Sequence, residues 1–224
     1  MRFLALALLA LFAATAVAEP STTRNESYVD PDLDMQRMID RLERETREVY
    51  SLRDEIVAAI GIAPGETVAD VGAGTGAFLD HLVEAVGPEG HLFTCEISIR
   101  FVERLRELAD ERGYDNVTTV YSSFTSATLP AASCDKIVHV DTYHHFDDHQ
   151  AMLASMFEAL KPGGEMIVVD FDRVEGKSRE WILGHVRASK QQFRSEIEAA
   201  GFEFVEEIEI DGMVDNFFHR YRRP

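Results

Sequence analysis

The stretch VADVGAGTG, residues 68–76, decides the fold. An apolar strand pattern leads into Gly72, Gly74 and Gly76, and a helical pattern begins at Ala77. Glycine accepts positive φ angles and leaves bare backbone that a ligand can approach. The helix that follows offers free N–H groups at its N-terminus. A strand, a glycine loop and a helix in this order predict a ligand site at the carboxyl end of the strand.

The chain beyond this unit continues to alternate strand and helix patterns. The expected strands are residues 67–71, 91–96, 117–121, 136–140, 166–170, 202–210 and 213–221, and the expected helices are residues 77–86, 99–112, 147–160 and 178–200. Such alternation predicts a mainly parallel sheet with helices on both faces. The turn Asp211-Gly212 joins the last two strands, so we expect them to pair antiparallel.

A helical region precedes the glycine strand, over residues 32–62. Its apolar residues fall on one helical face, and the pattern predicts a break near Thr46. We expect residues 32–224 to form one domain that includes this region.

The first residues have the pattern of a cleavable export signal. Arg2 is followed by an uncharged apolar run and by Ala16-Val17-Ala18, small residues of the kind that a signal peptidase reads. We therefore expect residues 1–18 to be removed and residues 19–31 to form a flexible linker. An uncleaved anchor is the alternative, but the run is shorter than the roughly 20 residues of a membrane span. The sequence thus predicts an exported protein, periplasmic or secreted.

The charge restricts the partners. The formal net charge is −18, which argues against nucleic acid, since phosphates are bound mainly through Lys and Arg. It argues equally against an anionic membrane surface, and it favours solubility. We expect no membrane association after signal cleavage. The sequence does not predict an oligomeric state.

The two cysteines are expected to be free thiols. Export makes a disulfide possible, but Cys95 lies late in one expected strand and Cys134 just before another. In a parallel sheet these positions lie at opposite ends.

The glycines alone leave two ligands open. Gly72, Gly74 and Ala77 also satisfy the dinucleotide fingerprint G-x-G-x-x-[G/A]. Asp70, two residues before the first glycine, favours another ligand, because its carboxylate would repel a pyrophosphate but can hold an ammonium. The long helix before the glycine strand and the antiparallel last strands also favour a ligand other than a dinucleotide.

Over residues 45–224 the chain resembles the class I S-adenosylmethionine-dependent methyltransferases. Residues 70–76 resemble their first motif, Glu96 their ribose-binding acid, residues 160–164 a loop before their fifth strand, and residues 215–221 their final strand. The resemblance implies a Rossmann-like three-layer α/β sandwich with a seven-stranded sheet of order 3-2-1-4-5-7-6. It also implies S-adenosylmethionine as the cofactor.

The resemblance assigns roles to individual residues. Asp70 and the glycine loop, with Gly72, Ala73, Gly74 and Gly76, should hold the methionine end of the cofactor. Glu96 should accept hydrogen bonds from both ribose hydroxyls. Ser123 and Phe124 follow the third strand, where the adenine should lie, and Asp141 ends the fourth strand beside the methyl donor.

The segment Asp141-Thr142-Tyr143-His144-His145-Phe146 lies where the resemblance places the transferred methyl. Methyl transfer needs an aligned nucleophile and, for many acceptors, a base that removes its proton. Histidine suits that role near neutral pH. We expect His144, His145 and Asp141 to be the catalytic residues, with His144 nearer the cleft. Structural packing of either histidine is the alternative.

The sequence does not favour a metal site. Magnesium-dependent catechol methyltransferases bind their metal at comparable strand ends, here Asp141, Asp170 and Asp172, but the usual acid-amide pair is missing. His139 and His149 lie near the histidine pair, and His139 is expected to pack inside. The segment 181–194, with His185, Arg187 and Lys190, either covers the substrate or forms an amphipathic core helix.

The sequence therefore predicts methyl transfer from S-adenosylmethionine to a small molecule, on nitrogen or oxygen rather than carbon. An NAD-dependent oxidoreductase is the enzyme alternative. A ligand-binding protein without catalysis is the other, because S-adenosylmethionine is made in the cytoplasm and its supply outside is uncertain.

Overall fold

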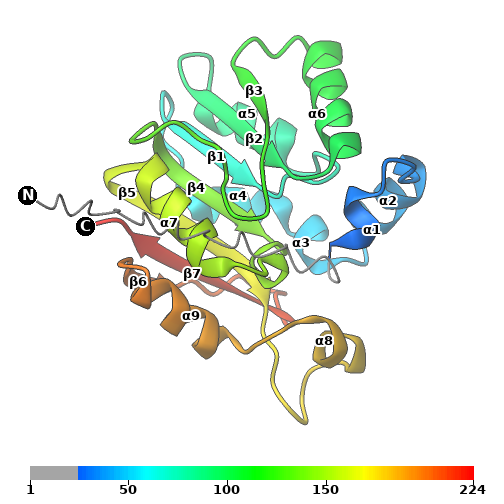
Figure 1. Cartoon of the computed structure of the whole chain (residues 1–224), viewed down its shortest axis with the longest axis vertical. Helices are drawn as coiled ribbons and strands as arrows, with labels where there is room; N and C mark the ends of the chain where they lie inside the picture. Colours follow the sequence, from blue (N-terminus) through cyan, green and yellow to red (C-terminus); the bar gives the residue numbers. More distant parts are fainter. Residues whose placement is uncertain (1–24) are drawn as a thin grey trace, which may run out of the picture.

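A seven-stranded sheet forms the centre of the computed structural model, which describes residues 25–224 (Figure 1). The expected export signal and the first part of the expected linker lie outside the described residues. The strand order is β3-β2-β1-β4-β5-β7-β6, as predicted. The strands are β1 (Thr67–Val71), β2 (His91–Glu96), β3 (Val117–Tyr121), β4 (Cys134–Val140), β5 (Leu160–Phe171), β6 (Glu203–Glu207) and β7 (Asn216–Arg222). Strands β1 to β5 are parallel, and β7 runs antiparallel to both of its neighbours.

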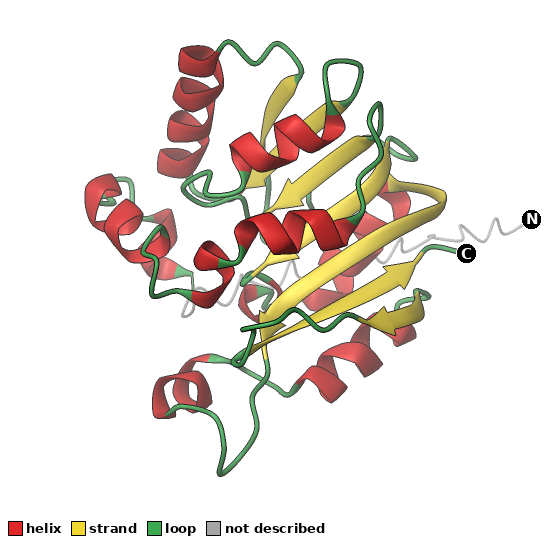
Figure 2. Cartoon of the chain, turned by 180° about the vertical axis from the view of Figure 1, so that it is seen from behind, coloured by secondary structure: helices red, strands yellow, loops and turns green. Residues whose placement is uncertain are grey.

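Helices cover both faces of the sheet (Figure 2). Helices α4 (Arg53–Ile60) and α5 (Leu79–Val86) pack on one face, and α7 (His149–Ala159) and α9 (Lys190–Ala199) pack on the other. Helix α6 (Ile99–Arg112) lies against β2 and β3. This is the predicted three-layer arrangement.

The two hydrophobic cores follow from the alternation of side chains along the strands. In β4, Ile137 belongs to the core under α7 and α9, whereas Val138 and Val140 belong to the core under α4 and α5. His139 points to the same side as Ile137, is fully buried and lies edge-on to Phe146. Burial lowers the pKa of His139 to about 4, so it is a neutral packing residue, as predicted.

The N-terminal helical region is divided into short helices, α2 (Met35–Leu42) and α3 (Glu48–Ser51), followed by α4. The break falls at residues 43–47, where the sequence predicted one. The linker expectation fails for residues 25–31, which form the short helix α1 (Glu26–Val29) and its flanks. The side chain of Asn25 is buried there and donates a hydrogen bond to the carbonyl of His145 at 3.0 Å, so tertiary contacts hold this polar segment.

The expected helix over residues 178–200 is two helices, α8 (Glu180–His185) and α9. The hydroxyl of Ser189 accepts a hydrogen bond from the N–H of Gln192, which starts a new helix after the break. The last strand pair is also shorter than expected. Strand β6 is an exposed edge strand that ends at Glu207. The expected turn at Asp211-Gly212 is present, but it lies within a longer connection, residues 208–215.

Cys95 and Cys134 are both buried free thiols, as predicted. Among residues 25–224, no helix combines the length and the apolar character needed to span a bilayer.

Candidate active site

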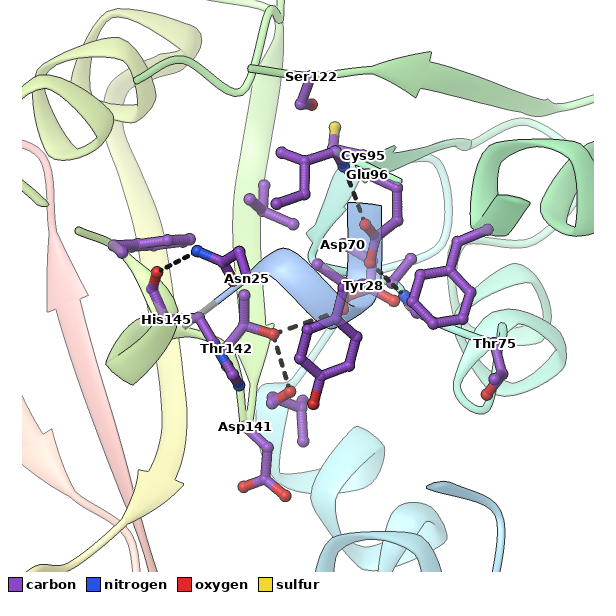
Figure 3. Close-up of a pocket in the computed structure, with 18 of the residues that line it drawn as sticks. Asn25, Tyr28, Asp70, Thr75, Cys95, Glu96, Ser122, Asp141, Thr142 and His145 are labelled. Atoms are coloured by element: carbon purple, nitrogen blue, oxygen red, sulfur yellow. Dashed lines mark hydrogen bonds between the residues drawn. The ribbon is translucent and has the colours of Figure 1, made fainter. Parts of the chain in front are cut away.

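A cleft opens at the carboxyl ends of β1, β2, β3 and β4, where the glycine loop begins (Figure 3). It encloses about 1010 Å³, including the part that is open to solvent. Most of the predicted cofactor residues line it: Asp70, Gly72, Ala73, Gly74, Glu96, Ser123, Phe124 and Asp141. The structure therefore brings together residues from four strand ends that are up to about 70 positions apart in the chain.

The glycine loop is shaped for close approach to its backbone. Gly72, Gly74 and Gly76 have φ angles of +84°, +56° and +89°, which favour glycine over residues with a Cβ atom. A Cβ at Gly72 would lie 2.3 Å from the Cγ2 atom of Thr142, so this glycine is required by packing. A Cβ at Gly74 would meet no atom closer than 3.8 Å. Gly74, which lines the cleft, therefore has room for a Cβ in ordinary contact with Leu42. Gly76 does not line the cleft; its neighbours are Leu105 and Leu108 of α6.

Glu96 is held rigidly at the end of β2. One carboxylate oxygen accepts a hydrogen bond from the N–H of Gly74 at 2.8 Å, and the other accepts from the N–H of Ile97 at 2.9 Å. Burial raises the pKa of Glu96, and these N–H groups counteract the rise. The glycine loop and the acid thus position each other before any ligand arrives.

Asp70 is buried next to Glu96 and has no partner of opposite charge among residues 25–224. Burial raises the pKa of Asp70 to about 7, and the charge of Glu96 adds to the rise. No hydrogen bond offsets these two effects. A buried acid beside another acid, at the wall of a cleft, is a ready partner for a cationic ligand.

Asp141 lies at the cleft wall, but its carboxylate is already bonded. Arg47, at the start of α3, contacts one oxygen at 2.8 Å, and the Asn216 amide donates to the other at 2.5 Å. The φ angle of Asp141 is +52°, which is unusual for a residue with a side chain. Figure 3 shows this carboxylate directed away from Asp70 and Glu96. Both oxygens of the Asp141 carboxylate are thus engaged by Arg47 and Asn216, which the sequence did not predict as its partners.

The histidine pair is split between the cleft and the interior. His145 lines the cleft, whereas His144 does not and is only 2% exposed. The Nδ1 atom of His144 lies 2.7 Å from a carboxylate oxygen of Asp170, and its backbone N–H donates to the other oxygen. The expected order is therefore reversed: the short 3-10 helix η1 (Tyr143–His145) turns His144 inward and His145 toward the ligand space.

Asn25, Tyr28 and Thr142 are among the residues that line the cleft without having been predicted to bind a ligand. Asn25 and Tyr28 come from the segment around α1, and the Tyr28 ring lies edge-on to His145 with centroids 5.3 Å apart. Thr142 donates to the carbonyl of Val140 at 3.0 Å and packs against the glycine loop. The segment around Asn25 is short and polar, so no pattern in it predicts that Asn25 and Tyr28 line the cleft.

Ser123 and Phe124, which follow β3, also line the cleft. Ser122 is buried, and its hydroxyl donates to the carbonyl of Ala127. No acidic side chain directly follows β3, so the Ser123 hydroxyl and backbone groups are the polar contacts available here.

The magnesium alternative does not fit the geometry. Asp141 is bonded to Arg47 and Asn216, Asp170 to His144, and Asp172 lies 3.5 Å from Lys190. In the segment 181–194, Arg187 pairs with Glu196, and neither Arg187 nor Lys190 lines the cleft. His185 also lies outside the cleft, but it approaches the histidine pair.

Comparison with known proteins gives the same class as the fold and the site. A methyltransferase domain family model matches residues 62–209, which is more than half of the chain. A solved S-adenosylmethionine-dependent methyltransferase from Aquifex aeolicus superposes with a TM-score of 0.73 at 22% identity, covering 85% of this chain and 99% of that one. The mitomycin 7-O-methyltransferase MmcR gives 0.70 at 20% identity, covering 88% of this chain and 59% of that one. At these identities the superpositions show the fold alone.

Curated relatives match part of the chain. A protein-L-isoaspartate O-methyltransferase from Ignicoccus hospitalis is 33% identical over 113 residues, 50% of this chain and 51% of the relative. A demethylmenaquinone methyltransferase from Anoxybacillus flavithermus is 26% identical over 118 residues, 53% of this chain and 50% of the relative. A phosphoethanolamine N-methyltransferase from Triticum aestivum is 31% identical over 133 residues, 59% of this chain and 26% of the relative. The chain thus spans about half or less of the length of these relatives.

The sheet order, the glycine loop and the acid at the end of β2 define a Rossmann-like domain of the S-adenosylmethionine-dependent class. The chain belongs to the methyltransferase domain family, and its cofactor is S-adenosylmethionine.

Proposed function

We propose that the protein transfers a methyl group from S-adenosylmethionine to a nitrogen or oxygen atom of a small molecule. One observation carries the proposal. Asp70, Gly74 and Glu96 meet in one cleft with His145 and Thr142, so a cofactor site and a space for an acceptor are continuous.

The cleft fits the cofactor on chemical grounds. The Asp70 carboxylate lacks a cationic partner among residues 25–224 and suits the ammonium of the methionine part. Gly74 leaves backbone uncovered, and the fixed carboxylate of Glu96 suits a pair of ribose hydroxyls. Bound S-adenosylmethionine supplies a methyl group on a positively charged sulfur, already activated for displacement.

The protein's part in the reaction is alignment and proton removal. His145 lies at the cleft wall, its backbone carbonyl is bonded to Asn25, and its ring lies against Tyr28. An imidazole in this place can accept the proton of an amine or hydroxyl acceptor as the new bond to carbon forms. The Asp141 carboxylate is already bonded to Arg47 and Asn216, so its role is to fix the backbone beside the cleft and not to take the proton itself.

A small acceptor suits the enclosed, acidic cleft. The related proteins named above act, by their names, on phosphoethanolamine, demethylmenaquinone and isoaspartate residues. Two of the names print the acceptor atom, oxygen for the isoaspartate enzyme and nitrogen for the phosphoethanolamine enzyme, and both atoms fall within the proposed class.

The test is incubation of the purified protein with methyl-labelled S-adenosylmethionine and a small-molecule extract, followed by identification of the labelled product. A labelled nitrogen or oxygen in a small product supports the proposal. Label on carbon or on protein would contradict the acceptor class. Absence of any label together with tight cofactor binding would favour the non-catalytic ligand-binding alternative.

A further inference from the structure

We propose that His144, His145 and His185 form a binding site for one divalent transition-metal ion of the zinc class. One ring nitrogen from each of the three residues lies within 4.8 Å of the other two. The residues come from separate segments, since His144 and His145 lie on η1 and His185 ends α8.

The three rings enclose a common point. Their centroids are 4.2 Å apart for His144 and His145, 5.0 Å for His144 and His185, and 5.1 Å for His145 and His185. Zinc–nitrogen bonds of about 2.0–2.1 Å require neighbouring ligand atoms about 3.4 Å apart in a tetrahedral site. His145 and His185 are only partly buried, so rotation of their rings can close the remaining gap.

His144 is prepared as a metal ligand. Its Nδ1 atom contacts Asp170 at 2.7 Å, so Nε2 is the nitrogen that remains for a metal. That Nε2 atom is buried and has no hydrogen-bond partner among the described residues. A carboxylate on the second nitrogen is the usual arrangement behind a zinc-binding histidine, because it fixes the tautomer and makes the ligand nitrogen more basic. Asp170 is in turn held by the N–H groups of His144 and Phe171.

The ligand set indicates the kind of metal. Imidazole nitrogens suit zinc, copper, nickel and iron, whereas magnesium and calcium prefer oxygen ligands. Three histidines leave at least one coordination position for water or another ligand, as in catalytic zinc sites. His145 also lines the cleft, so an ion held here would lie at its wall. The binding itself does not depend on the proposed methyl transfer. His145 serves as the base only in the ion-free protein, because an imidazole coordinated through one nitrogen carries its proton on the other.

The experiment uses the untagged protein, freed of metal with a chelator and then titrated with Zn²⁺ by calorimetry and with Co²⁺ by visible absorption. We expect one ion per chain and the absorption bands of a tetrahedral Co²⁺ site. His185→Ala should weaken binding on the order of 100-fold or more, and Asp170→Asn about 10- to 100-fold. His81→Ala is the matched control, because His81 pairs with Asp54 outside the cluster, and its affinity should equal that of the wild type.

His185→Ala is the deciding variant, because His185 is partly exposed and takes no part in the buried pair of His144 and Asp170. Circular dichroism establishes that the variant is folded. The proposal is overturned if the wild-type protein binds neither ion stoichiometrically. It is equally overturned if folded His185→Ala binds with wild-type affinity, or if His81→Ala weakens binding as much. Because no cofactor or acceptor is present, a negative result here leaves the proposed methyl transfer untouched.

Discussion

The Arg47 guanidinium contacts the Asp141 carboxylate at 2.8 Å, with side-chain exposures of 19% and 4%. The pair connects the N-terminal helical region to the end of β4, across 94 positions of the chain. Burial raises the pKa of Asp141, and Arg47 counteracts the rise. The region before the glycine strand is therefore part of the site, and not only a support for the sheet.

Arg47→Ala should destabilise the protein by about 2 to 4 kcal/mol, because it leaves a buried carboxylate without its cation. Denaturant unfolding at pH 7 measures the loss. Arg44→Ala is the control, since Arg44 is exposed three residues away, and its stability should stay within about 0.5 kcal/mol of wild type. Equal stability of the two variants would show that the ion pair contributes nothing.

Gly74→Val and Asp70→Ala should each weaken S-adenosylmethionine binding, measured by calorimetry. The valine covers backbone that faces the cleft, and the alanine removes the carboxylate expected to hold the ammonium. Gly113→Val is a matched control for strain, because Gly113 has φ +68° and no atom within 4 Å of its built Cβ. Wild-type cofactor affinity in both site variants would refute the assignment of the cleft.

The stability of the ligand-free protein should fall as the pH rises from about 4 to about 7. In that window the folded Asp70 still binds its proton, because its pKa is raised to about 7, whereas the unfolded residue has lost it. The unfolded state then binds fewer protons, so unfolding becomes easier with rising pH until the folded group also ionises.

Asp70→Asn should therefore stabilise the ligand-free protein at pH 8 by up to about 4 kcal/mol, with little change at pH 4. It should weaken cofactor binding at the same time. Thermal unfolding at the two pH values measures the difference. A variant that is no more stable than wild type at pH 8 would contradict this cost of burial.

His145→Ala should lower kcat by about 10²- to 10⁴-fold while cofactor affinity is retained, if the imidazole removes the acceptor's proton. Steady-state kinetics with the identified acceptor, together with calorimetry, separates the two quantities. His144→Ala should act mainly on stability, since it leaves Asp170 buried without its imidazole. A full rate in His145→Ala would make that residue structural and leave catalysis to alignment alone.

The export hypothesis is tested separately from the fold. The mature protein should begin at Glu19 and be recovered outside the cytoplasm of the producing cell. Sequencing of its N-terminus after fractionation gives the answer. An intact Met1 on a soluble cytoplasmic species would reject the export signal.

Local patterns in the sequence were enough to predict the sheet and the cleft residues that lie at the ends of β1 and β2. The apolar run before Gly72 predicts β1, the glycines predict an uncovered loop, and Glu96 ends the next strand pattern. Parallel strands bring their carboxyl ends to one edge, so residues at these ends meet whatever the rest of the chain does. Backbone periodicity therefore suffices to predict this part of the site.

Only the tertiary structure decided which side chains pair across the cleft. His185 lies within 4.8 Å of His144 and His145 because the chain breaks after α8, and Arg47 reaches Asp141 because α3 packs beside the end of β4. The His144 ring is directed into the interior because it bonds to Asp170, a buried residue near the end of β5. Such contacts depend on the angles at which helices meet the sheet and on rotations within a single turn, and no repeating pattern in the sequence encodes either one.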